Sequence, residues 1–433
     1  MPDSPVKEHS HPTSPLPILI GPSAGTLAGQ ASGPEVYFRK GFGLKAQVQQ
    51  ELASDYSGRL VDLLRERDFT LTSGDVTLRL AREFGFCYGV ERAVDYAYQT
   101  RAKFPDRRVY LAGEIIHNPH VNGKLREMGV EILEIGPSGI DYSGVLAVDV
   151  VILPAFGVTI HDFEQLRKVG CVMVDTTCGS VLNVWKRVES YARDGFTSLI
   201  HGKYYHEETR ATASQAAKHP NAHHFVVRNM EEARVVCDFI EGHVTSEDLM
   251  NRFGNAVSSG FDPARDFARI GVANQTTMLA RESLAIGVEV RSAMARSRGE
   301  EYAAASFRSF DTICSATQER QDAVVELLRE PLDVMVVIGG YNSSNTISLA
   351  ALCAETVTTY HVEDAAAIDP ESRSIRHRPS GAHDDVDEPG WLDLPAGPVR
   401  VGVTAGASTP NNKIGDAVAR IFATRGIDPQ AIE

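Results

Sequence analysis

No apolar run in this 433-residue sequence approaches the roughly 18 residues that a membrane-spanning helix needs, so we expect no membrane segment. The apolar stretch 16–20 is too short for a secretory signal and lacks a basic n-region. A transit peptide would be rich in arginine and poor in acidic residues, whereas residues 1–31 contain no arginine and include Asp3 and Glu8. We therefore expect a cytoplasmic protein.

Basic residues are fewer than acidic ones. There are 43 Lys and Arg against 57 Asp and Glu, a formal net charge of −14, and no stripe of Lys or Arg interrupts that excess. We expect no nucleic-acid partner held by a basic field, so an anionic ligand must be held locally. The six cysteines show no close pairing, which excludes a disulfide scaffold and indicates a reducing compartment.

What the sequence does contain is an alternation of short apolar runs with helical patterns, which is typical of α/β layers with parallel strands. An apolar content of 43% suffices for a large core and for two or three domains. Residues 1–34 have no periodicity and are predicted to be a disordered tail, followed by an ordered N-terminal arm at 35–75. The predicted strands are 76–80, 109–112, 148–153, 172–174, 198–200, 224–227, 269–273, 334–338, 358–361 and 399–403.

These strands are too many for one ordinary sheet. We therefore divide the chain into three α/β modules, each beginning near one cysteine, at residues 76–178, 179–313 and 314–433. Two polar stretches, 244–266 and 369–398, lack periodicity and are predicted to be surface insertions.

Three cysteines share one local pattern. Cys178 follows the apolar run 172–174 and ends a D-T-x-C motif, and Cys314 ends a second copy of this motif. Cys87 lies between strand 76–80 and a helical pattern. A thiol at a strand-to-helix junction faces backbone N–H groups and the positive end of a helix dipole, which favour a metal-binding thiolate. Their spacing fits no zinc finger or ferredoxin, and the alternative is three thiols buried in cores. That alternative fits the remaining cysteines, Cys171, Cys237 and Cys353, whereas we expect the first three to converge.

The segment H-G-K-Y-Y-H-E-E-T-R at 201–210 follows the predicted strand 198–200. Ligands of open α/β sheets bind at the carboxyl ends of the strands, where a His, two Glu and a Thr would offer proton donors and acceptors. The alternative is a solvated helix N-terminus, in which Glu and Thr are ordinary capping residues.

Two loops are suited to phosphate. Residues 339–346 follow strand 334–338, and residues 404–410 follow strand 399–403, each opening a helical pattern. Small residues let backbone N–H groups approach an anion, and Ser and Asn add donors without bulk. Helix capping explains either loop alone, but two such loops in one module favour a phosphate or diphosphate site.

Seven motifs carry a resemblance to a known enzyme family: G-F-C-Y-G-V-E-R-A at 85–93, E-I-I-H-N-P at 114–119, V-D-T-T-C at 174–178, H-G-K-Y-Y-H-E-E-T at 201–209, N-Q-T-T at 274–277, N-S-S-N at 342–345 and V-T-A-G-A-S at 403–408. The chain resembles the 4-hydroxy-3-methylbut-2-enyl diphosphate reductases, the terminal enzymes of the non-mevalonate (MEP) isoprenoid pathway. The arm at 39–43 and the loop at 154–157 resemble the longer branch of this family, found in plants and cyanobacteria.

The resemblance implies a fold and a cofactor. We expect three αβα modules with mainly parallel sheets around a central 4Fe-4S cluster, held by Cys87, Cys178 and Cys314. The fourth iron would lack a protein ligand and would bind the allylic hydroxyl of the substrate, while the cluster delivers two electrons in turn. Loss of water and protonation would give isopentenyl or dimethylallyl diphosphate, with a ferredoxin, a flavodoxin or an equivalent as the electron donor.

The resemblance also implies roles for individual residues. Glu208 matches the proton donor of the family, and Thr276 matches a residue that helps to orient the hydroxyl. The positions that match diphosphate ligands are His117, His206, Ser343, Ser344, Asn345 and Ser408.

Three features depart from the family pattern. Phe156 stands where many bacterial members have a phosphate-contacting histidine, a contact that Lys203 could replace. Gly179 follows Cys178 where proline is usual, which loosens the start of the helix. The insertion 369–398 has no assigned role.

Two other functions compete with the reductase. A quinolinate-synthase-like enzyme would share the three cysteines and the cluster but would take carboxylic acids, whereas the N-S-S-N and T-A-G-A-S loops favour diphosphate. An iron–sulfur sensor would not need Glu208, and the charge of −14 does not suggest a nucleic-acid surface.

Overall fold

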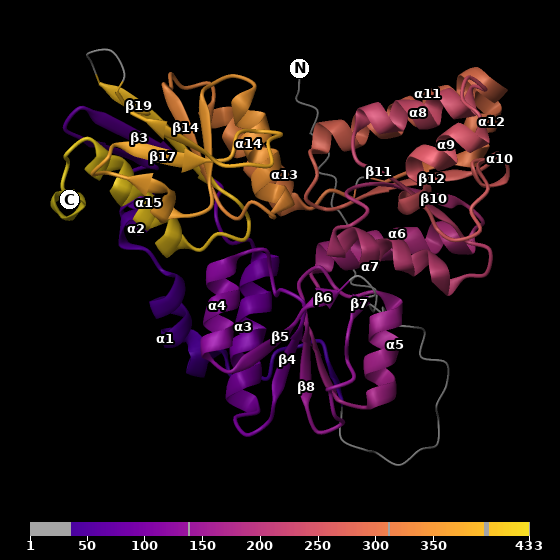
Figure 1. The fold of residues 1–433 in the computed structure, drawn as a ribbon, viewed down its shortest axis with the longest axis horizontal. Coiled ribbons are helices and arrows are strands. Elements are labelled where there is room, and N and C mark those ends of the chain that lie inside the picture. The colour runs from indigo at the N-terminus through magenta and orange to yellow at the C-terminus, as the bar shows by residue number, and fades with distance from the viewer. Residues whose placement is uncertain (1–35, 137–138, 311, 394–397, 433) are drawn as a thin grey trace, which may run out of the picture. The chain divides into compact units, whose positions relative to one another are not determined.

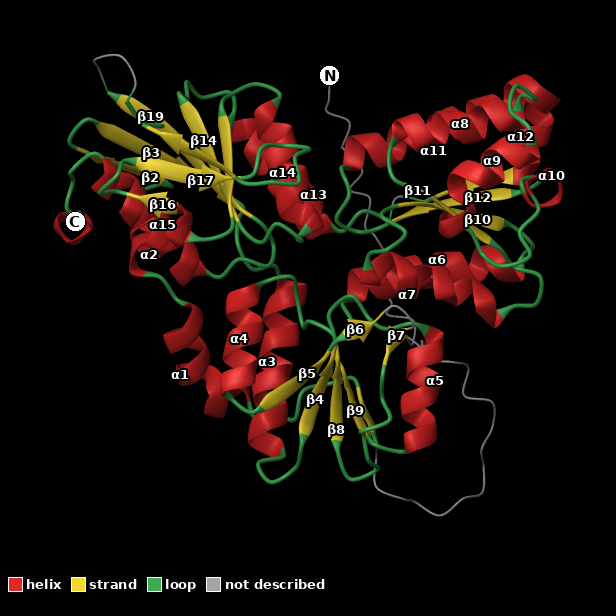
Figure 2. Ribbon diagram, viewed as in Figure 1, coloured by secondary structure: helices red, strands yellow, loops and turns green. Residues whose placement is uncertain are grey.

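The computed structural model describes residues 36–136, 139–310, 312–393 and 398–432 (Figure 1). The predicted tail 1–34 lies outside these residues. The described part of the chain forms three larger sheets, each flanked by helices (Figure 2). All pairings within these sheets are parallel except one, which confirms the predicted α/β class with mainly parallel strands.

The first sheet has the order β1-β9-β8-β4-β5. Its strands are β1 (Tyr37–Phe38), β9 (Val172–Asp175), β8 (Val150–Leu153), β4 (Val109–Ala112) and β5 (Val130–Leu133). Helices α3 (Tyr88–Lys103) and α4 (Pro119–Glu127) lie on one face and α5 (Ile160–Val169) on the other (Figure 1). Burial on both faces explains why β8 reads as an unbroken apolar run. A small antiparallel pair, β6 (Ile135–Gly136) and β7 (Gly139–Ile140), follows β5.

The predicted N-terminal arm joins this first sheet. Tyr37 of β1 pairs with Met173 of β9, and the Tyr37 hydroxyl donates to the Asp175 carboxylate at 2.5 Å. Helix α1 (Lys45–Tyr56) follows, and its Tyr56 packs against Tyr98 of α3. The arm is therefore part of the first core.

The second sheet has the order β11-β10-β12-β13. Its strands are β11 (His224–Val227), β10 (Thr197–His201), β12 (Ile270–Asn274) and β13 (Phe307–Ser309). Helices α8 (Met230–Ile240) and α11 (Ala280–Arg298) pack side by side on one face, and α6 (Gly179–Arg193) lies on the other (Figure 2). The remaining helices are α7 (Glu207–Ser214), α9 (Ser246–Phe253), α10 (Pro263–Asp266) and α12 (Glu300–Ser306).

The prediction of a surface insertion at 244–266 is wrong. Leu249 and Phe253 of α9 are buried, and the Phe253 ring lies 5.0 Å from that of Phe225 in β11. These two residues stand four positions apart on one helical face, so a single short apolar stripe buries the segment although its composition is polar.

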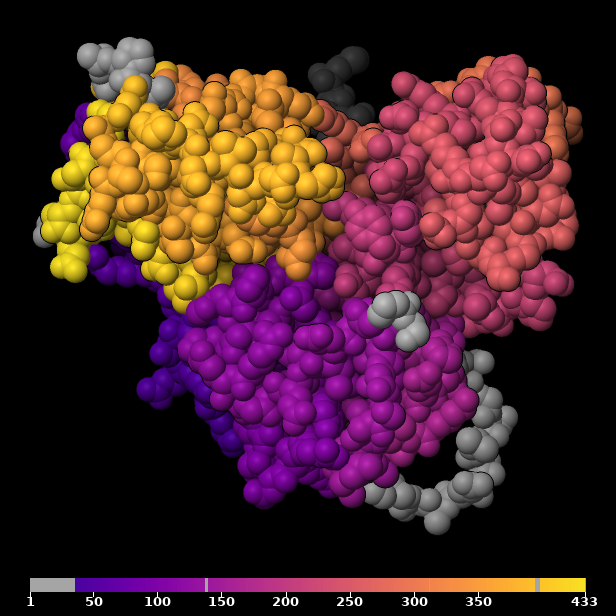
Figure 3. All heavy atoms as spheres, viewed as in Figure 1, coloured from indigo at the N-terminus to yellow at the C-terminus, as the bar shows by residue number. Residues whose placement is uncertain are grey.

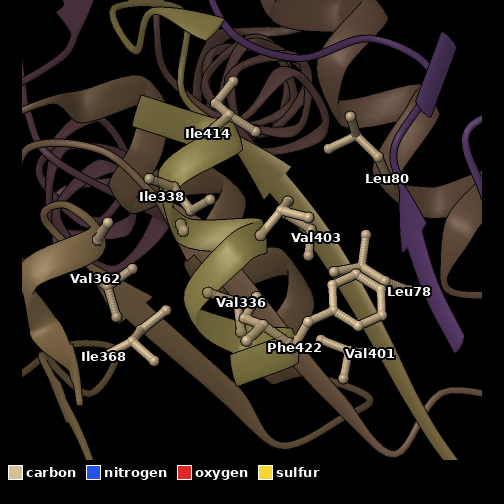
Figure 4. Packing of buried hydrophobic residues seen from close by; sticks show 14 of the residues in the cluster. Leu78, Leu80, Val336, Ile338, Val362, Ile368, Val401, Val403, Ile414 and Phe422 are labelled. Atoms are coloured by element: carbon tan, nitrogen blue, oxygen red, sulfur yellow. The ribbon is translucent and has the colours of Figure 1, made fainter. Parts of the chain in front are cut away.

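The third sheet has the order β15-β14-β19-β3-β2. Its strands are β15 (Thr359–Val362), β14 (Val334–Ile338), β19 (Val399–Ala405), β3 (Val76–Leu80) and β2 (Thr70–Ser73), of which β2 and β3 are antiparallel. Helices α2 (Arg59–Glu66) and α15 (Asn411–Thr424) cover one face, and α13 (Ser315–Leu327) and α14 (Ser344–Ala354) cover the other. Figure 4 shows Phe422 of α15 packed against Leu78, Val336 and Val401.

Strand β3 was predicted to open the module 76–178, but it belongs to the third sheet. It pairs along its whole length with β19, with Leu78 opposite Val401. Both strands bury alternate side chains in the hydrophobic core under α15. A neighbouring strand from the first sheet would not contribute side chains to this core. The other module boundaries stay predictions.

The predicted surface insertion 369–398 is also partly buried, within its described residues. Strands β16 (Ile368–Asp369), β17 (Ser374–His377) and β18 (Val386–Pro389) form an antiparallel sheet. Ile375, Trp391 and Leu392 are buried in the core of the third sheet. In Figure 3 the orange and yellow atoms of this region cover the near side of that part of the molecule.

The remaining short elements are the 3-10 helices η1 (Gln215–Lys218), η2 (Gly254–Ala256), η3 (Ala365–Ala367) and η4 (Pro429–Ala431). Among the described residues, none of the helices combines the length and the apolar character that crossing a bilayer requires.

Candidate functional site

Each of the three predicted metal-ligating cysteines is the N-cap residue of a helix. Cys87 precedes α3, Cys178 precedes α6 and Cys314 precedes α13, all with extended backbone. The three helices flank three different sheets. A thiol at each position lies beside the backbone N–H groups of the first helical turn, which have no partner within the helix, and beside the positive end of the helix dipole.

The thiols of Cys87 and Cys178 meet at Gly89. A Cβ atom on Gly89 would lie 2.6 Å from the Cys178 Sγ, which is too close, and 3.8 Å from the Cys87 Sγ, which is an ordinary contact. Glycine therefore leaves room for the Cys178 thiol, and both sulfur atoms lie next to this residue. Cys314 belongs to the same group, since its charge and that of Cys178 raise the pKa of Cys87, although burial is the main cause of that increase. The three cysteines therefore converge, as predicted from their shared sequence pattern.

Burial also raises the pKa of the Cys314 thiol, while hydrogen bonds from Thr317 oppose the increase. The Thr317 backbone N–H donates to the Cys314 Sγ at 3.3 Å. None of the six cysteines is in a disulfide. Cys171, Cys237 and Cys353 are at most 3% exposed in separate hydrophobic cores, which agrees with their expected structural role.

One buried and one partly buried arginine, both missed by sequence reasoning, hold the loops of these cysteines. Arg320, 3% exposed, donates to the Gly85 carbonyl at 2.7 Å, just before Cys87. Arg92 donates to the carbonyls of Thr176 and Thr177, at 3.1 and 2.5 Å, just before Cys178. Since each acceptor is a backbone carbonyl, no side-chain motif in the sequence reveals these contacts.

Glu208 is a buried acid close to the cysteines. It is 2% exposed, and its Oε1 accepts a 2.6 Å hydrogen bond from the backbone N–H of Thr276. Burial raises its pKa from 4.5 to about 7. The charge of Glu208 in turn raises the pKa of Cys314, so the carboxyl lies within electrostatic range of this thiol. The structure thus brings the predicted acid, Thr276 and the cysteine group together.

The neighbouring Glu207 points elsewhere, as expected for successive residues in the first turn of a helix. Its carboxylate is about one-third exposed and lies 3.5 Å from the Nε2 of His117.

His117 and His206 lie against each other, with 3.1 Å between their Nε2 atoms. Phe156 stacks on His117 with 4.4 Å between ring centroids and 17° between ring planes. The phenyl ring therefore packs on the imidazole instead of offering a contact to phosphate. Lys203 lines the same cleft as the two histidines, and its role as a replacement ligand stays a prediction.

The predicted phosphate loops meet at the start of α14. Ser343 is the N-cap of this helix, and the Ser408 hydroxyl donates to the His117 carbonyl at 3.1 Å and to Ser343 Oγ at 3.4 Å. The Asn345 Oδ1 accepts from the backbone N–H of Ala407 at 2.8 Å, which joins the two loops. The Ser344 Oγ and Asn345 Nδ2 are buried and have no hydrogen-bond partner among the residues that the structure describes. These two buried donors are free to bind an acceptor such as an anionic ligand.

Gly179 begins α6, so this helix forms without the proline that is usual in the family. Glu114 is a further residue whose position the sequence did not reveal. Its Oε2 lies 3.0 Å from the Nδ1 of His117 and accepts a 3.3 Å hydrogen bond from Asn342. Glu114 is the first residue of the motif E-I-I-H-N-P, but only the folded chain shows its contact with His117.

The sequence of the chain matches the family described as LytB protein over residues 78–422. It is 47% identical over 394 residues to the 4-hydroxy-3-methylbut-2-enyl diphosphate reductase of Thermosynechococcus vestitus, covering 91% of this chain and 96% of that protein. The protein of the same name from Gloeobacter violaceus is 48% identical over 396 residues, covering 90% and 93%. A solved E-1-hydroxy-2-methyl-but-2-enyl-4-diphosphate reductase from Plasmodium falciparum shares the fold, with a TM-score of 0.58 at 20% identity over 80% of this chain and 87% of that chain.

Proposed function

Because this chain belongs to the LytB protein family, we propose that it catalyses the reductive dehydroxylation of (E)-4-hydroxy-3-methylbut-2-enyl diphosphate to isopentenyl and dimethylallyl diphosphate. The reaction consumes two electrons and two protons and releases water. The observation that carries the proposal is the group of three helix-capping cysteines beside the buried Glu208.

The three thiols fit a 4Fe-4S cluster. They come from three segments, the sulfur atoms of Cys87 and Cys178 both lie next to Gly89, and all three are free. We assign Cys87, Cys178 and Cys314 as the protein ligands. When bound, such a cluster supplies electrons and, at an iron without a protein ligand, Lewis acidity.

The diphosphate is assigned to the junction of the two small-residue loops. The unpaired Ser344 hydroxyl and Asn345 amide would donate to its oxygens, together with Ser343, Ser408, His117 and His206. This set replaces the strong basic patch that the sequence lacks, since buried neutral donors can stabilise an anion locally.

Glu208 is proposed as the acid that protonates the leaving hydroxyl and, through the diphosphate of the substrate, the allylic carbon. A pKa of about 7 keeps a substantial fraction of this carboxyl protonated near neutral pH, which an exposed glutamic acid would not be. Thr276, whose N–H holds the Glu208 carboxylate, is proposed to orient the substrate hydroxyl.

We also propose that a ferredoxin, a flavodoxin or an equivalent delivers the electrons, and that the protein works in the cytoplasm. Six cysteines without a disulfide support a reducing compartment.

The test is turnover of the substrate by anaerobically prepared protein with a chemically reduced donor. Asn345→Ala should raise KM at least about tenfold, because a buried hydrogen bond to a charged group is lost, and should leave the iron content unchanged. Asn251→Ala, at an exposed position of α9, is the matched control. Turnover of quinolinate precursors, or iron binding without turnover of the diphosphate, would reject the reductase in favour of a quinolinate-synthase-like enzyme or a sensor.

A further inference from the structure

A chain of hydrogen bonds leads from the first turn of α7 to Glu114. The Glu208 backbone N–H donates to the Nδ1 of His206 at 3.1 Å. The Nε2 atoms of His206 and His117 are 3.1 Å apart, and the Nδ1 of His117 is 3.0 Å from the Glu114 Oε2. Since a backbone N–H can only donate, the Nδ1 of His206 accepts, and the proton of a neutral His206 is on Nε2.

The cluster of His117, His206 and Glu207 has two possible roles, a metal site or a hydrogen-bonded pair of histidines beside a carboxylate. The position of the His206 proton decides between them. Their ligand atoms lie close enough together to suit a metal ion. A metal on the Nε2 of neutral His206 would, however, move the proton to Nδ1, where it would oppose the N–H of Glu208. The helix cap therefore favours a hydrogen-bonded pair of histidines over a metal site.

The same reasoning shows which ring nitrogen of neutral His117 carries the proton. In the ligand-free protein its Nε2 accepts from the Nε2–H of His206, so its proton is on Nδ1 and is donated to Glu114. An anion bound by both Nε2 atoms needs an N–H donor from each histidine. His117 could supply its donor by moving its proton from Nδ1 to Nε2, but the Nδ1 lone pair would then face the Glu114 carboxylate at 3.0 Å, so gaining a second proton is favoured.

We propose that Glu114 is a positioning residue that stabilises the doubly protonated form of His117, so that binding of a diphosphate is accompanied by proton uptake at this histidine. The proposal rests on the proposed function, because it takes the diphosphate as the ligand of this site. Proton transfer is balanced: the proton comes from solvent, enters at the Nε2 of His117 and leaves when the diphosphate dissociates.

The groups around His117 favour this charge. The carboxylates of Glu114 and Glu207 lie 3.0 and 3.5 Å from its two ring nitrogens, and Glu208 also interacts with it electrostatically. Lys203 and His206 oppose the charge, but burial lowers the pKa of His206 well below its usual range and keeps that ring neutral. Phe156 covers one face of the His117 ring without contributing charge.

Calorimetric titration of the anaerobic holoenzyme with inorganic diphosphate tests the proposal. Repeating the titration in buffers with different ionisation enthalpies gives the number of protons taken up. Glu114→Gln keeps the shape and the acceptor of this side chain but removes its charge. Glu127→Gln, on the exposed part of α4 where Glu127 pairs with Lys124, is the matched control.

We expect Glu114→Gln to take up fewer protons than the wild type and to bind diphosphate about tenfold more weakly at pH 7, because a hydrogen bond between two charged groups is replaced by a weaker one to a neutral acceptor. Its affinity should also vary less with pH, whereas the control should match the wild type. Proton release by the ligand itself is common to all three proteins and cancels. Equal proton uptake in wild type and Glu114→Gln, or an affinity loss that is the same at every pH, would overturn the proposal.

If the proposed function is wrong, the same titrations give a different result. If inorganic diphosphate does not bind, or if its affinity is unchanged in Asn345→Ala, the diphosphate site itself is wrong. If it binds and needs Asn345 but shows no dependence on Glu114, only the role of Glu114 is refuted.

Discussion

Replacing Glu208 by glutamine should make the protein more stable and nearly inactive. The glutamine keeps the acceptor for the Thr276 N–H but cannot transfer a proton. Because loss of a general acid typically lowers the rate by about 10²–10⁴-fold, turnover with a chemically reduced donor should fall by that factor. Substrate affinity and iron content should change much less.

The stability change follows from burial of the carboxyl. The rise of its pKa from 4.5 to about 7 corresponds to about 3 kcal/mol. Since the folded state holds this proton more tightly than the unfolded state, the free energy of unfolding decreases as the pH rises from about 4.5 through about 7, and the full cost is present above that range. Glutamine carries no such cost, so Glu208→Gln should be more stable than wild type at pH 8 by up to about 3 kcal/mol and equal to it near pH 4.

Denaturant unfolding at these two pH values, followed by tryptophan fluorescence under anaerobic conditions, measures the difference. Glu207→Gln is the matched control, because the Glu207 carboxylate is partly exposed and lies beside His117. Near-normal turnover of Glu208→Gln, or a crippled Glu207→Gln, would show that the acid is assigned to the wrong residue. A stability difference that does not depend on pH would refute the protonation argument.

Three further predictions concern other parts of the chain. Serine at any of the three site cysteines should abolish iron binding by the anaerobic protein, measured as iron per chain, whereas serine at Cys171, Cys237 or Cys353 should retain it; equal behaviour of the two sets would reject the ligand assignment. Deleting residues 1–34 should leave the melting temperature nearly unchanged, whereas deleting 1–43 should lower it by removing β1 and its bond to Asp175; equal tolerance would contradict the boundary. Trp391→Ala should destabilise the protein by about 3–5 kcal/mol in denaturant unfolding, because the indole is 3% exposed in the third core; a change within experimental error would mean that the insertion does not support that core.

The sequence predicted the buried strands well, and a physical reason is visible in β14. Val334, Val336 and Ile338 face the core under α15, whereas Met335 and Val337 face the core under α14. A strand buried on both faces must be apolar at every position, so it is recognisable without an alignment. Strands such as β1 and β13 have only two or three residues, and β18 is exposed throughout, so none of them carries such a pattern.

The order of strands in a sheet could not be predicted in this way. Nothing in residues 76–80 indicates that their neighbour is at 399–405, because any apolar strand of suitable length would satisfy the same pattern. The same limit on prediction from sequence applies to the site. The types and places of Cys178, Glu208 and Asn345 were predicted from motifs, but the contacts of Arg320 and Glu114 depend on distances between segments far apart in the sequence.

The pairing of β3 with β19 also governs when the protein can mature. Cys87 lies at the end of the loop between β3 and α3, and its backbone N–H donates to the Ala407 carbonyl just beyond β19. A nascent chain that has not yet emerged from the ribosome as far as this strand holds its first cysteine without the scaffold that aims it at the other two. The proposed set of three cysteine ligands therefore takes its final arrangement only after β19, which follows the third cysteine in the sequence, has been synthesised.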